Sequence, residues 1–238
     1  MKILSFYNKD FESIVRDELG IFDRPITEED ALSLDLLDLS DFTFDIEDCS
    51  TLCFFRNLDW LDINIGFNNL AFLGELSLLT ELNIEFHGDT FDFSHLTPLK
   101  NLDCLQVSGG DWSDFRFVYL EELSWLPNLT SLALHEFGSI DLFGLKKLPH
   151  LSSFYCGYGR EVKNANAISH LVNLKALTLV DITVDTLSFL DLLDRDAILG
   201  LFSINVLDDF DIKSLDRFNK NEIEFENIIV KGKQQISN

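Results

Sequence analysis

The stretch Leu-Pro-Asn-Leu-Thr-Ser-Leu-Ala-Leu at residues 126–134 decides the fold. It contains the pattern Leu-x-x-Leu-x-Leu, and this pattern, with other apolar residues allowed, occurs nine times along the 238-residue chain. The nine matches begin at positions 34, 58, 79, 102, 129, 151, 174, 199 and 225, so their steps lie between 21 and 27 residues. A repeat of this length is typical of a solenoid, in which each unit packs on the next.

Each repeat has two apolar tracks with different periods. The Leu-x-Leu part alternates with period two, which predicts a half-buried strand. A second track steps by three residues, as in Leu120, Leu123 and Leu126, and predicts a tight helical or 3-10 return path. Because no unit can bury its own leucines, stacked neighbours must bury them in one continuous core.

Dipeptides at the strand entries point to a known family. Asn57-Leu58, Asn101-Leu102, Asn128-Leu129 and Asn173-Leu174 precede strands. With Leu126-Pro127-Asn128-Leu129, they resemble the bacterial leucine-rich-repeat family, most closely the internalin-like or SDS22-like class. The resemblance covers roughly residues 10–230 and implies an α/β solenoid. That fold has a curved parallel sheet of about nine short strands on the concave face, short helices and 3-10 turns on the convex face, and a helical N-terminal cap.

One position departs from that family. The family places an asparagine three residues after the last strand leucine, where it bonds to neighbouring backbones in a ladder. Here the corresponding residues are Phe42, Gly66, His87, Gly110, Phe137, Gly159, Ile182 and Leu207. We therefore expect the ladder to be missing, the 22 phenylalanines to form a hydrophobic spine in its place, and the solenoid to curve unevenly.

The two ends of a solenoid need polar-faced caps. We expect residues 1–33 to form a helical cap and residues 34–238 the solenoid with its C-terminal cap, together one structural domain. Asp10 is the predicted N-cap of a helix through Leu19, and Gly20 its end. Thr27 and Asp30 predict a capping box.

At the C-terminus, we expect residues 208–218 to be helical and residues 225–230 to form the last strand. The polar residues 231–238 are expected to fray.

Composition excludes several classes of function. A net charge of −23 argues against binding to nucleic-acid phosphates or to anionic lipid. No run approaches the ~20 apolar residues of a transmembrane helix, and the N-terminus lacks a signal-peptide core. The four cysteines have no Cys-x-x-Cys spacing, which predicts free thiols in the reducing cytoplasm.

Catalytic and metal-binding motifs are missing from the sequence. The five histidines fall in different repeats, and none pairs at i, i+4 with another histidine or a cysteine. The sequence contains no His-Glu-x-x-His, no Gly-x-Ser-x-Gly and no P-loop. We predict no catalytic residue, no cofactor and no metal, and therefore a protein that is not an enzyme.

The outward-facing strand positions define a candidate binding surface. Residues 1–120 carry a net charge of −17 and residues 121–238 a net charge of −6. The first half of the predicted concave face is thus acidic beside Trp60, and the second half is neutral. In the eighth unit the motif places Leu199, Phe202 and Ile204 inward, and therefore Leu201 outward. The candidate partner-binding residues are Asp38, Trp60, Asp62, Asn64, Glu81, Asn83, Glu85, Gln106, His135 and Tyr155.

These features predict a cytoplasmic, monomeric, non-enzymatic module that binds a basic protein on its acidic concave face. Two alternatives remain open at this point. One is an immunity-type inhibitor that sequesters a toxin or effector. The other is a purely structural scaffold, whose acidity only keeps a chain rich in leucine and phenylalanine soluble.

Overall fold

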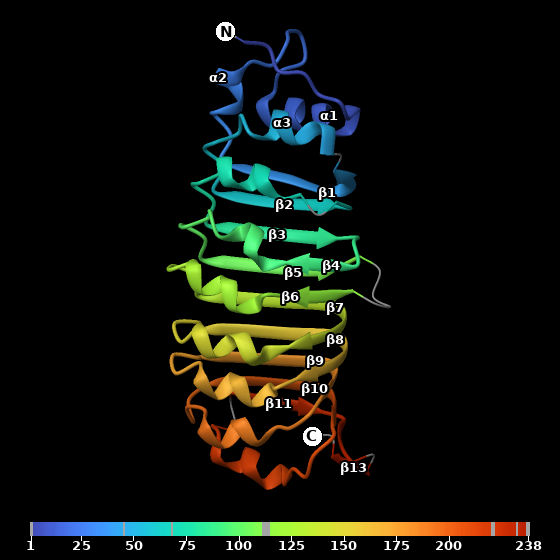
Figure 1. Ribbon diagram of the computed structural model, residues 1–238, viewed down its shortest axis with the longest axis vertical. Helices are drawn as coiled ribbons and strands as arrows, with labels where there is room; N and C mark the ends of the chain where they lie inside the picture. The colour runs from blue at the N-terminus through green and yellow to red at the C-terminus, as the bar shows by residue number, and fades with distance from the viewer. Residues whose placement is uncertain are drawn as a thin grey trace.

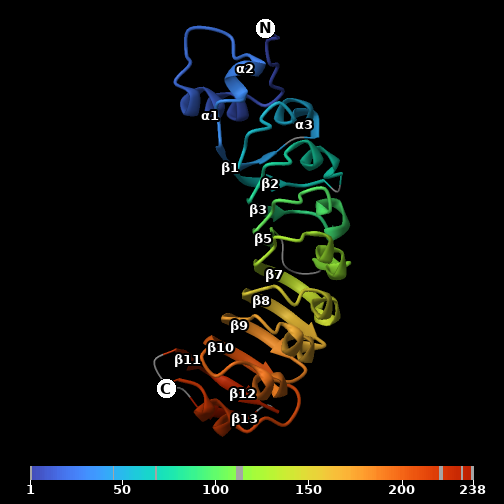
Figure 2. The ribbon, with the colours of Figure 1, turned by 90° about the vertical axis from the view of Figure 1, so that its left-hand side faces the viewer.

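The computed structural model describes residues 2–44, 46–67, 69–110, 115–219, 222–231 and 233–236. The chain forms an elongated stack with its two termini at opposite ends (Figure 1). Seen from the side, strands line one face and short helical turns line the other, and the strand face is the concave one (Figure 2).

The strands pair in one sheet in the order β1-β2-β3-β5-β7-β8-β9-β10-β12-β13, with β11 on β10, β6 on β7, and β4 on β6. Every pair is parallel except β12 with β13. The nine sequence matches fall on β1, β2, β3, β5, β7, β8, β9, β10 and the β11–β12 unit, so the predicted parallel sheet is confirmed. The bounds are β1 (Leu36–Phe44), β2 (Trp60–Ile65), β3 (Glu81–Phe86), β4 (Thr90–Asp92), β5 (Cys104–Gly109), β6 (Arg116–Val118), β7 (Ser131–Asp141), β8 (Ser153–Lys163), β9 (Ala176–Val184), β10 (Ile198–Val206), β11 (Ile223–Glu226), β12 (Ile228–Val230) and β13 (Lys233–Ile236).

The return paths are short helices on the convex face, as the three-residue track predicts. The Asp92, Asp141 and Asp211 side chains cap three of them, each accepting a hydrogen bond from the backbone N–H two residues further on. The bounds are η1 (Ile46–Asp48), α3 (Cys49–Leu52), η2 (Ala71–Glu75), η3 (Phe93–Leu96), η4 (Leu120–Trp125), η5 (Leu142–Lys147), η6 (Ala165–His170), η7 (Ser188–Leu192) and η8 (Ile212–Arg217).

Two helices, α1 (Lys9–Leu19) and α2 (Glu28–Ala31), precede the first strand. The N-cap of α1 is Asn8, whose side chain accepts from two backbone N–H groups, so the prediction of Asp10 was wrong by two residues. Gly20 ends α1 in the left-handed conformation at φ 65°, as expected. The capping box of Thr27 and Asp30 is confirmed, with the shorter aspartate in place of glutamate.

Alternation along the strands builds the core. In β2 and β3 every second residue is buried, and the buried residues of successive strands are direct neighbours in the sheet. The core runs without a break from Phe11 to Val230. Cys156, fully buried in β8, takes a leucine position of this core and behaves as a small apolar residue there.

Phenylalanine rings fill the strand-end side of the core in two groups. The first joins Phe11 of α1 to Phe44 and Phe55, at centroid distances of 5.3 and 6.0 Å. The second is larger, and the expected spine therefore exists as two clusters. Its members are Phe86, Phe91, Phe93, Phe115, Phe117 and Phe137.

The C-terminal strands contain a repeated bulge. One residue in each adopts the left-handed conformation, with φ between 47° and 57°, and these residues align across the sheet. They are Glu136, Tyr158, Asp181, Ser203 and Asn227. Behind the bulge the next residue turns into the core, at the family's ladder position, as Phe137 and Ile182 show. A buried apolar residue or glycine therefore replaces the asparagine ladder in this half.

Asparagines do tie the repeats together, but at the convex side of the strand entry. The side-chain amide of Asn57 donates to the Leu32 carbonyl one repeat earlier, at 2.7 Å. Asn101, Asn128 and Asn173 make the same bond to Ser77, Lys100 and Pro149. The Asn-Leu dipeptides thus form a ladder of their own.

Four sequence predictions near the C-terminus need correction. Leu201 is buried beside Leu179, and Phe202 lies on the outer face beside Val180. The shift also means that Ile204, and not the exposed Leu207, occupies the ladder position. The helical segment is shorter than expected, and residues 233–236 pair as β13 where fraying was predicted. The side chain of Phe42, in the ladder prediction, lies outside the described residues.

Candidate functional site

The ten predicted site residues all lie on the outer face of the sheet, in three columns that cross the strands. The register pairs Asp38 with Asp62, Asp62 with Asn83, and Asn83 with Gln106, which form the middle column and lead on to Tyr155 in β8. Trp60 and Glu81 are neighbours in the first column. Asn64, Glu85 and His135 belong to the third column. The structure therefore brings them onto one concave face.

Four carboxylates form what we call the acidic patch, over β1, β2 and β3. They are Asp38, Asp62, Glu81 and Glu85. The Asn83 amide donates to Asp62 Oδ2 at 3.2 Å, which holds this carboxylate in place. Partial burial raises the pKa of Asp62, and the nearby charges of Asp38 and Glu85 raise it further, against the opposing effect of the Asn83 hydrogen bond. Asp62 is thus a partly desolvated negative charge that two neighbouring carboxylates repel.

Apolar and amide groups border the acidic patch. Trp60 is partly buried, between Leu36, which is 46% exposed, and Glu81. Asn64 Oδ1 is buried and has no hydrogen-bond partner among the described residues. A buried acceptor without a donor costs free energy, and a donor from a bound partner would relieve that cost.

The third column carries further acids toward the middle of the sheet. Glu85 Oε1 lies 3.1 Å from His87 Nε2. Ser108 Oγ donates to Glu136 Oε2 at 3.1 Å, and Glu136 is the first of the left-handed bulge residues. Glu136 therefore extends the negative surface to β7, although the sequence did not single it out.

The neutral half is centred on His135 and Tyr155, which we call the aromatic pair. Their rings stack at a centroid distance of 4.4 Å and an interplanar angle of 29°. Burial lowers the pKa of His135, and its Nε2 has no hydrogen-bond partner among the described residues. Burial and the neighbouring Tyr158 hydroxyl raise the pKa of Tyr155 to about 12. Both side chains are therefore neutral near pH 7.

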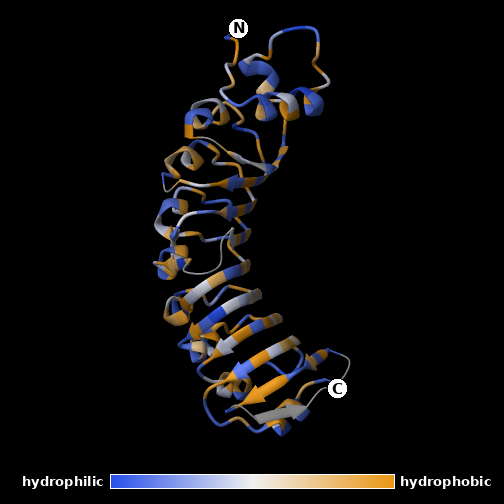
Figure 3. Ribbon diagram, turned by 90° about the vertical axis from the view of Figure 1, so that its right-hand side faces the viewer, coloured by the Kyte–Doolittle hydropathy of each residue, from blue (hydrophilic) through white to orange (hydrophobic). Residues whose placement is uncertain are grey.

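Phe202 is the main residue of this face that sequence reasoning missed. Together with Val180, its direct neighbour in β9, it adds an apolar pair to the third column of the concave face. Figure 3 shows hydrophobic residues dominating the strands toward the C-terminus. The signal was present in Leu199-Gly200-Leu201, whose alternation continues the strand pattern of the preceding repeats and places residue 202 outward.

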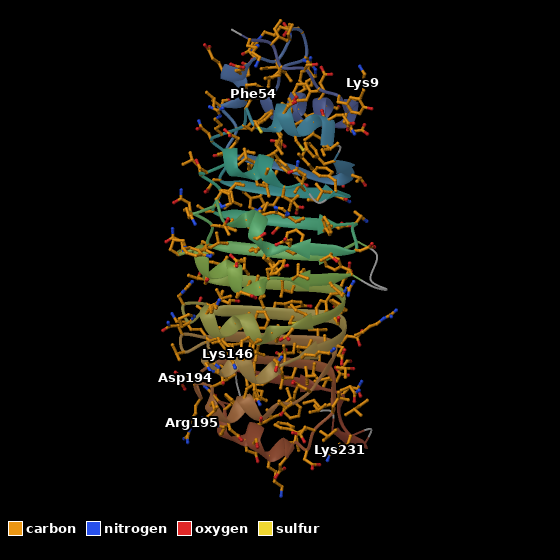
Figure 4. The ribbon with its side chains drawn as sticks, viewed as in Figure 1. Lys9, Phe54, Lys146, Asp194, Arg195 and Lys231 are labelled. Atoms are coloured by element: carbon orange, nitrogen blue, oxygen red, sulfur yellow. The ribbon has the colours of Figure 1, made fainter. Side chains whose placement is uncertain are left out.

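The strands that carry the acidic patch have no basic side chains. Strands β1, β2, β3 and β5 contain no lysine or arginine. Figure 4 shows Lys9 at the N-terminal end of the stack and Lys231 at the C-terminal end, where Lys231 pairs with Asp209 at 2.7 Å. On the convex helix η5, Lys146 Nζ lies 4.1 Å from the centre of the Phe143 ring. The negative charge of the acidic patch is thus not neutralised by cations of its own strands.

Within the described ranges, no three side chains of histidine, cysteine, aspartate or glutamate come together as a metal site. No helix in the same ranges is both long and apolar enough to cross a membrane.

The comparisons with known proteins bear on the fold. No family model and no curated protein matches the chain. Among solved structures, internalin C2 of Listeria monocytogenes superposes with a TM-score of 0.70 and 19% identity, over 94% of both chains. The fold is a leucine-rich-repeat solenoid.

Two more distant structures also match. An internalin (InlF) of Listeria monocytogenes has a TM-score of 0.46 and 16% identity, over 94% of this chain and 84% of that one. A leucine-rich-repeat protein of Leptospira interrogans has a TM-score of 0.48 and 14% identity, over 85% of this chain and 69% of that one. At these identities the likeness concerns the solenoid architecture, and function must be argued from the concave face itself.

Proposed function

We propose that this solenoid is a non-enzymatic protein-binding module whose concave face holds a basic protein partner. The observation that carries the proposal is the acidic patch of Asp38, Asp62, Glu81 and Glu85, on strands that contain no lysine or arginine. Eight parallel strands from β1 to β10 at ~4.8 Å spacing give a face about 34 Å long, enough for a small domain.

Electrostatics favour a cationic partner for two reasons. A lysine or arginine placed over Asp62 would offset the repulsion that Asp38 and Glu85 exert on it. The net charge of −17 in residues 1–120 would also steer a basic protein toward this half of the solenoid and accelerate association at low salt.

The test is a capture experiment from source-cell lysate with tagged protein, at low and high salt. The test variant carries Asp62→Lys and Glu85→Lys. A matched control carries Asp191→Lys and Asp216→Lys, which make the same change in charge at exposed positions of the convex helices η7 and η8. We expect a partner that both salt and the concave variant remove, while the convex variant retains it.

Three other outcomes would contradict the proposal. Loss of the partner with the convex variant alone would move the site off the concave face. Binding that neither salt nor the concave variant changes would remove the electrostatic argument. Finding no partner in the lysate would favour a purely structural scaffold, whose acidity serves solubility.

An immunity-type inhibitor is the second candidate. The observation that favours it is the concentration of negative charge on one compact, capped solenoid, which suits the sequestration of a basic toxin or effector domain. Co-expression with toxins encoded beside its gene tests this. We expect survival of cells with one of them, and loss of that protection with the concave variant.

The ends of the solenoid support a monomer. We propose that residues 1–33, with α1 and α2, cap the β1 end, and that β13 covers the edge of β12. Covered ends disfavour edge-to-edge pairing of copies. Four free cysteines further support a reducing, cytoplasmic compartment. Light scattering at working concentration should give the mass of one chain, and a dimer mass would contradict the capping argument.

A further inference from the structure

The bulge in the C-terminal strands creates a second surface feature beside the concave face. Where Tyr158, Asp181 and Ser203 adopt the left-handed conformation, each strand bends and then continues in the sheet. A groove of about 600 Å³ follows this turn, a volume within the roughly 300–1,000 Å³ of small-molecule sites. We call it the lateral trough.

Two rows of side chains form the walls of the lateral trough. Tyr158, Asp181 and Ser203 come from the bulge positions of β8, β9 and β10. Arg160, Thr183 and Asn205 follow two residues later in the same strands. Phe137 and Ile182 lie at its floor, where both are buried. The trough thus has polar walls and an apolar floor, and it runs across the strands.

The chemistry of the walls excludes most classes of ligand. One arginine and one aspartate leave the six wall residues without net charge, which does not suit a polyanion in a protein of net charge −23. An apolar ligand would leave the hydroxyl, amide and carboxylate groups of the walls without water or partner. Because the trough crosses paired strands, a peptide lying in it meets no free sheet edge with which to form backbone bonds.

A neutral saccharide meets each of these conditions. Its hydroxyls both donate and accept, and the walls offer carboxylate, amide, guanidinium and hydroxyl groups. Asn205 Nδ2 donates to Thr183 Oγ1 at 3.4 Å, a long bond that a ligand hydroxyl can replace. Tyr158 is 47% exposed and offers a ring against which the C–H face of a sugar can pack.

The spacing of the walls fits a chain of sugars. Each successive strand adds one residue to each row at ~4.8 Å, similar to the length of one pyranose unit in an extended glycan. From these observations we propose that the lateral trough binds a short neutral oligosaccharide across β8, β9 and β10. This site is separate from the acidic patch, and its use does not depend on the proposed function.

The experiment titrates maltotriose, cellotriose and chitotriose, the last in its N-acetylated form, into the full-length protein and follows binding by saturation-transfer NMR and calorimetry. We expect at least one of them to bind with a Kd of about 1 mM or tighter. The test variant carries Asp181→Ala and Asn205→Ala, and its affinity should fall tenfold or more. The control carries Asp191→Ala and Asn166→Ala, the same substitutions at exposed positions of the convex helices η7 and η6, and should bind as the wild type does.

Several results would overturn the inference. One is that none of the three trisaccharides saturates the protein at concentrations well above that value. Another is equal affinity of the test variant and the wild type, with both folded by circular dichroism. A third is that tetraalanine binds with the same dependence on Asp181 and Asn205, which would assign the trough to peptides. A Tyr158→Ala variant, which keeps the polar walls, should weaken binding less than the double variant does.

Discussion

The strands of the two halves of this solenoid end in different ways. In β2, β3 and β5 six residues alternate strictly, and the chain then leaves the main sheet. In β7 to β10 the strands run for 9 to 11 residues, because a left-handed residue in each allows the chain to turn and continue. Both halves use the same leucine pattern, so the difference arises after the last inward leucine.

The two endings fill the same part of the core by different means. In the N-terminal half, where Gly109 ends β5, the ring of Phe115 occupies the space that a side chain at Gly109 would need. In the C-terminal half, Gly159 leaves room for the ring of Phe137, and Ile182 fills the next strand. Figure 2 shows the sheet bending more strongly over the C-terminal strands than over β2 to β5, which agrees with the expected uneven curvature.

The largest expected effect breaks the phenylalanine cluster between the halves. Phe117 contacts the rings of Phe91, Phe93, Phe115 and Phe137 at 4.8 to 6.4 Å. We expect Phe117→Ala to lower the free energy of unfolding by about 3–5 kcal/mol, measured by urea denaturation, since a large buried ring is lost.

The control for that prediction is Phe143→Ala, at a ring 58% exposed on the convex face. It should cost no more than about 0.5 kcal/mol, as surface substitutions do. If Phe117→Ala and Phe143→Ala lowered the free energy of unfolding equally, the phenylalanine cluster would not join the two halves.

A smaller effect sharpens the role of Gly159. A Cβ there would lie 2.1 Å from the ring of Phe137, so Gly159→Ala should cost about 1–3 kcal/mol by overpacking. Phe137→Ala removes the obstructing ring, and the double variant should therefore be more stable than the sum of the two single costs predicts. Strict additivity in a urea double-mutant cycle would show that the ring is not what requires glycine. Gly66→Ala, with its nearest atom at 3.8 Å, serves as the control.

The left-handed column gives the next prediction. Ser203 is exposed at φ 54°, a conformation that favours glycine. We expect Ser203→Gly to stabilise the protein by about 0.5–1 kcal/mol. Ser108→Gly, at an ordinary strand position of β5, should destabilise it by a similar amount. Thermal unfolding measures both changes. If the two substitutions shifted the unfolding temperature in the same direction, the left-handed conformation would not distinguish the C-terminal strands from β5.

The smallest effect concerns the charge of the acidic patch. Because the pKa of Asp62 is raised by folding, the folded state binds more protons between the unfolded and folded pKa values. The contribution of Asp62 to the free energy of unfolding therefore falls as pH rises from the unfolded pKa to the folded pKa. Above the folded pKa this contribution remains unfavourable. Asp62→Asn should be more stable than the wild type at neutral pH and equal to it below the window. A stability difference that does not vary with pH would contradict this.

Repeat spacing alone was enough to predict the parallel sheet, the return helices and the placement of the ten site residues on one face. The bulges could not be predicted, because Glu136, Tyr158, Asp181, Ser203 and Asn227 share no chemical type, and only Asp181 and Asn227 belong to types enriched in the left-handed region. The shift at Phe202 arose because Leu199, Phe202 and Ile204 match the spacing of the motif, whereas the inward pair of β10 is Leu199 and Leu201, which leaves the polar Asp196 at the first motif position. The polar residues 233–236 carried no apolar signal, and their pairing depends on an edge that only the fold creates.

Two free thiols of this solenoid sit on opposite sides of the same sheet. Cys104 lies partly exposed on the concave face, in register with Glu81, whereas Cys156 is fully buried behind the sheet. An alkylating reagent reaches the first in the folded chain and the second only when β8 opens. Labelling followed separately at these two sites, apart from the partly exposed Cys49 and Cys53, therefore gives two rates. The faster rate, at Cys104, falls when a bound protein covers the concave face, and the slower rate, at Cys156, reports how often the repeat array opens.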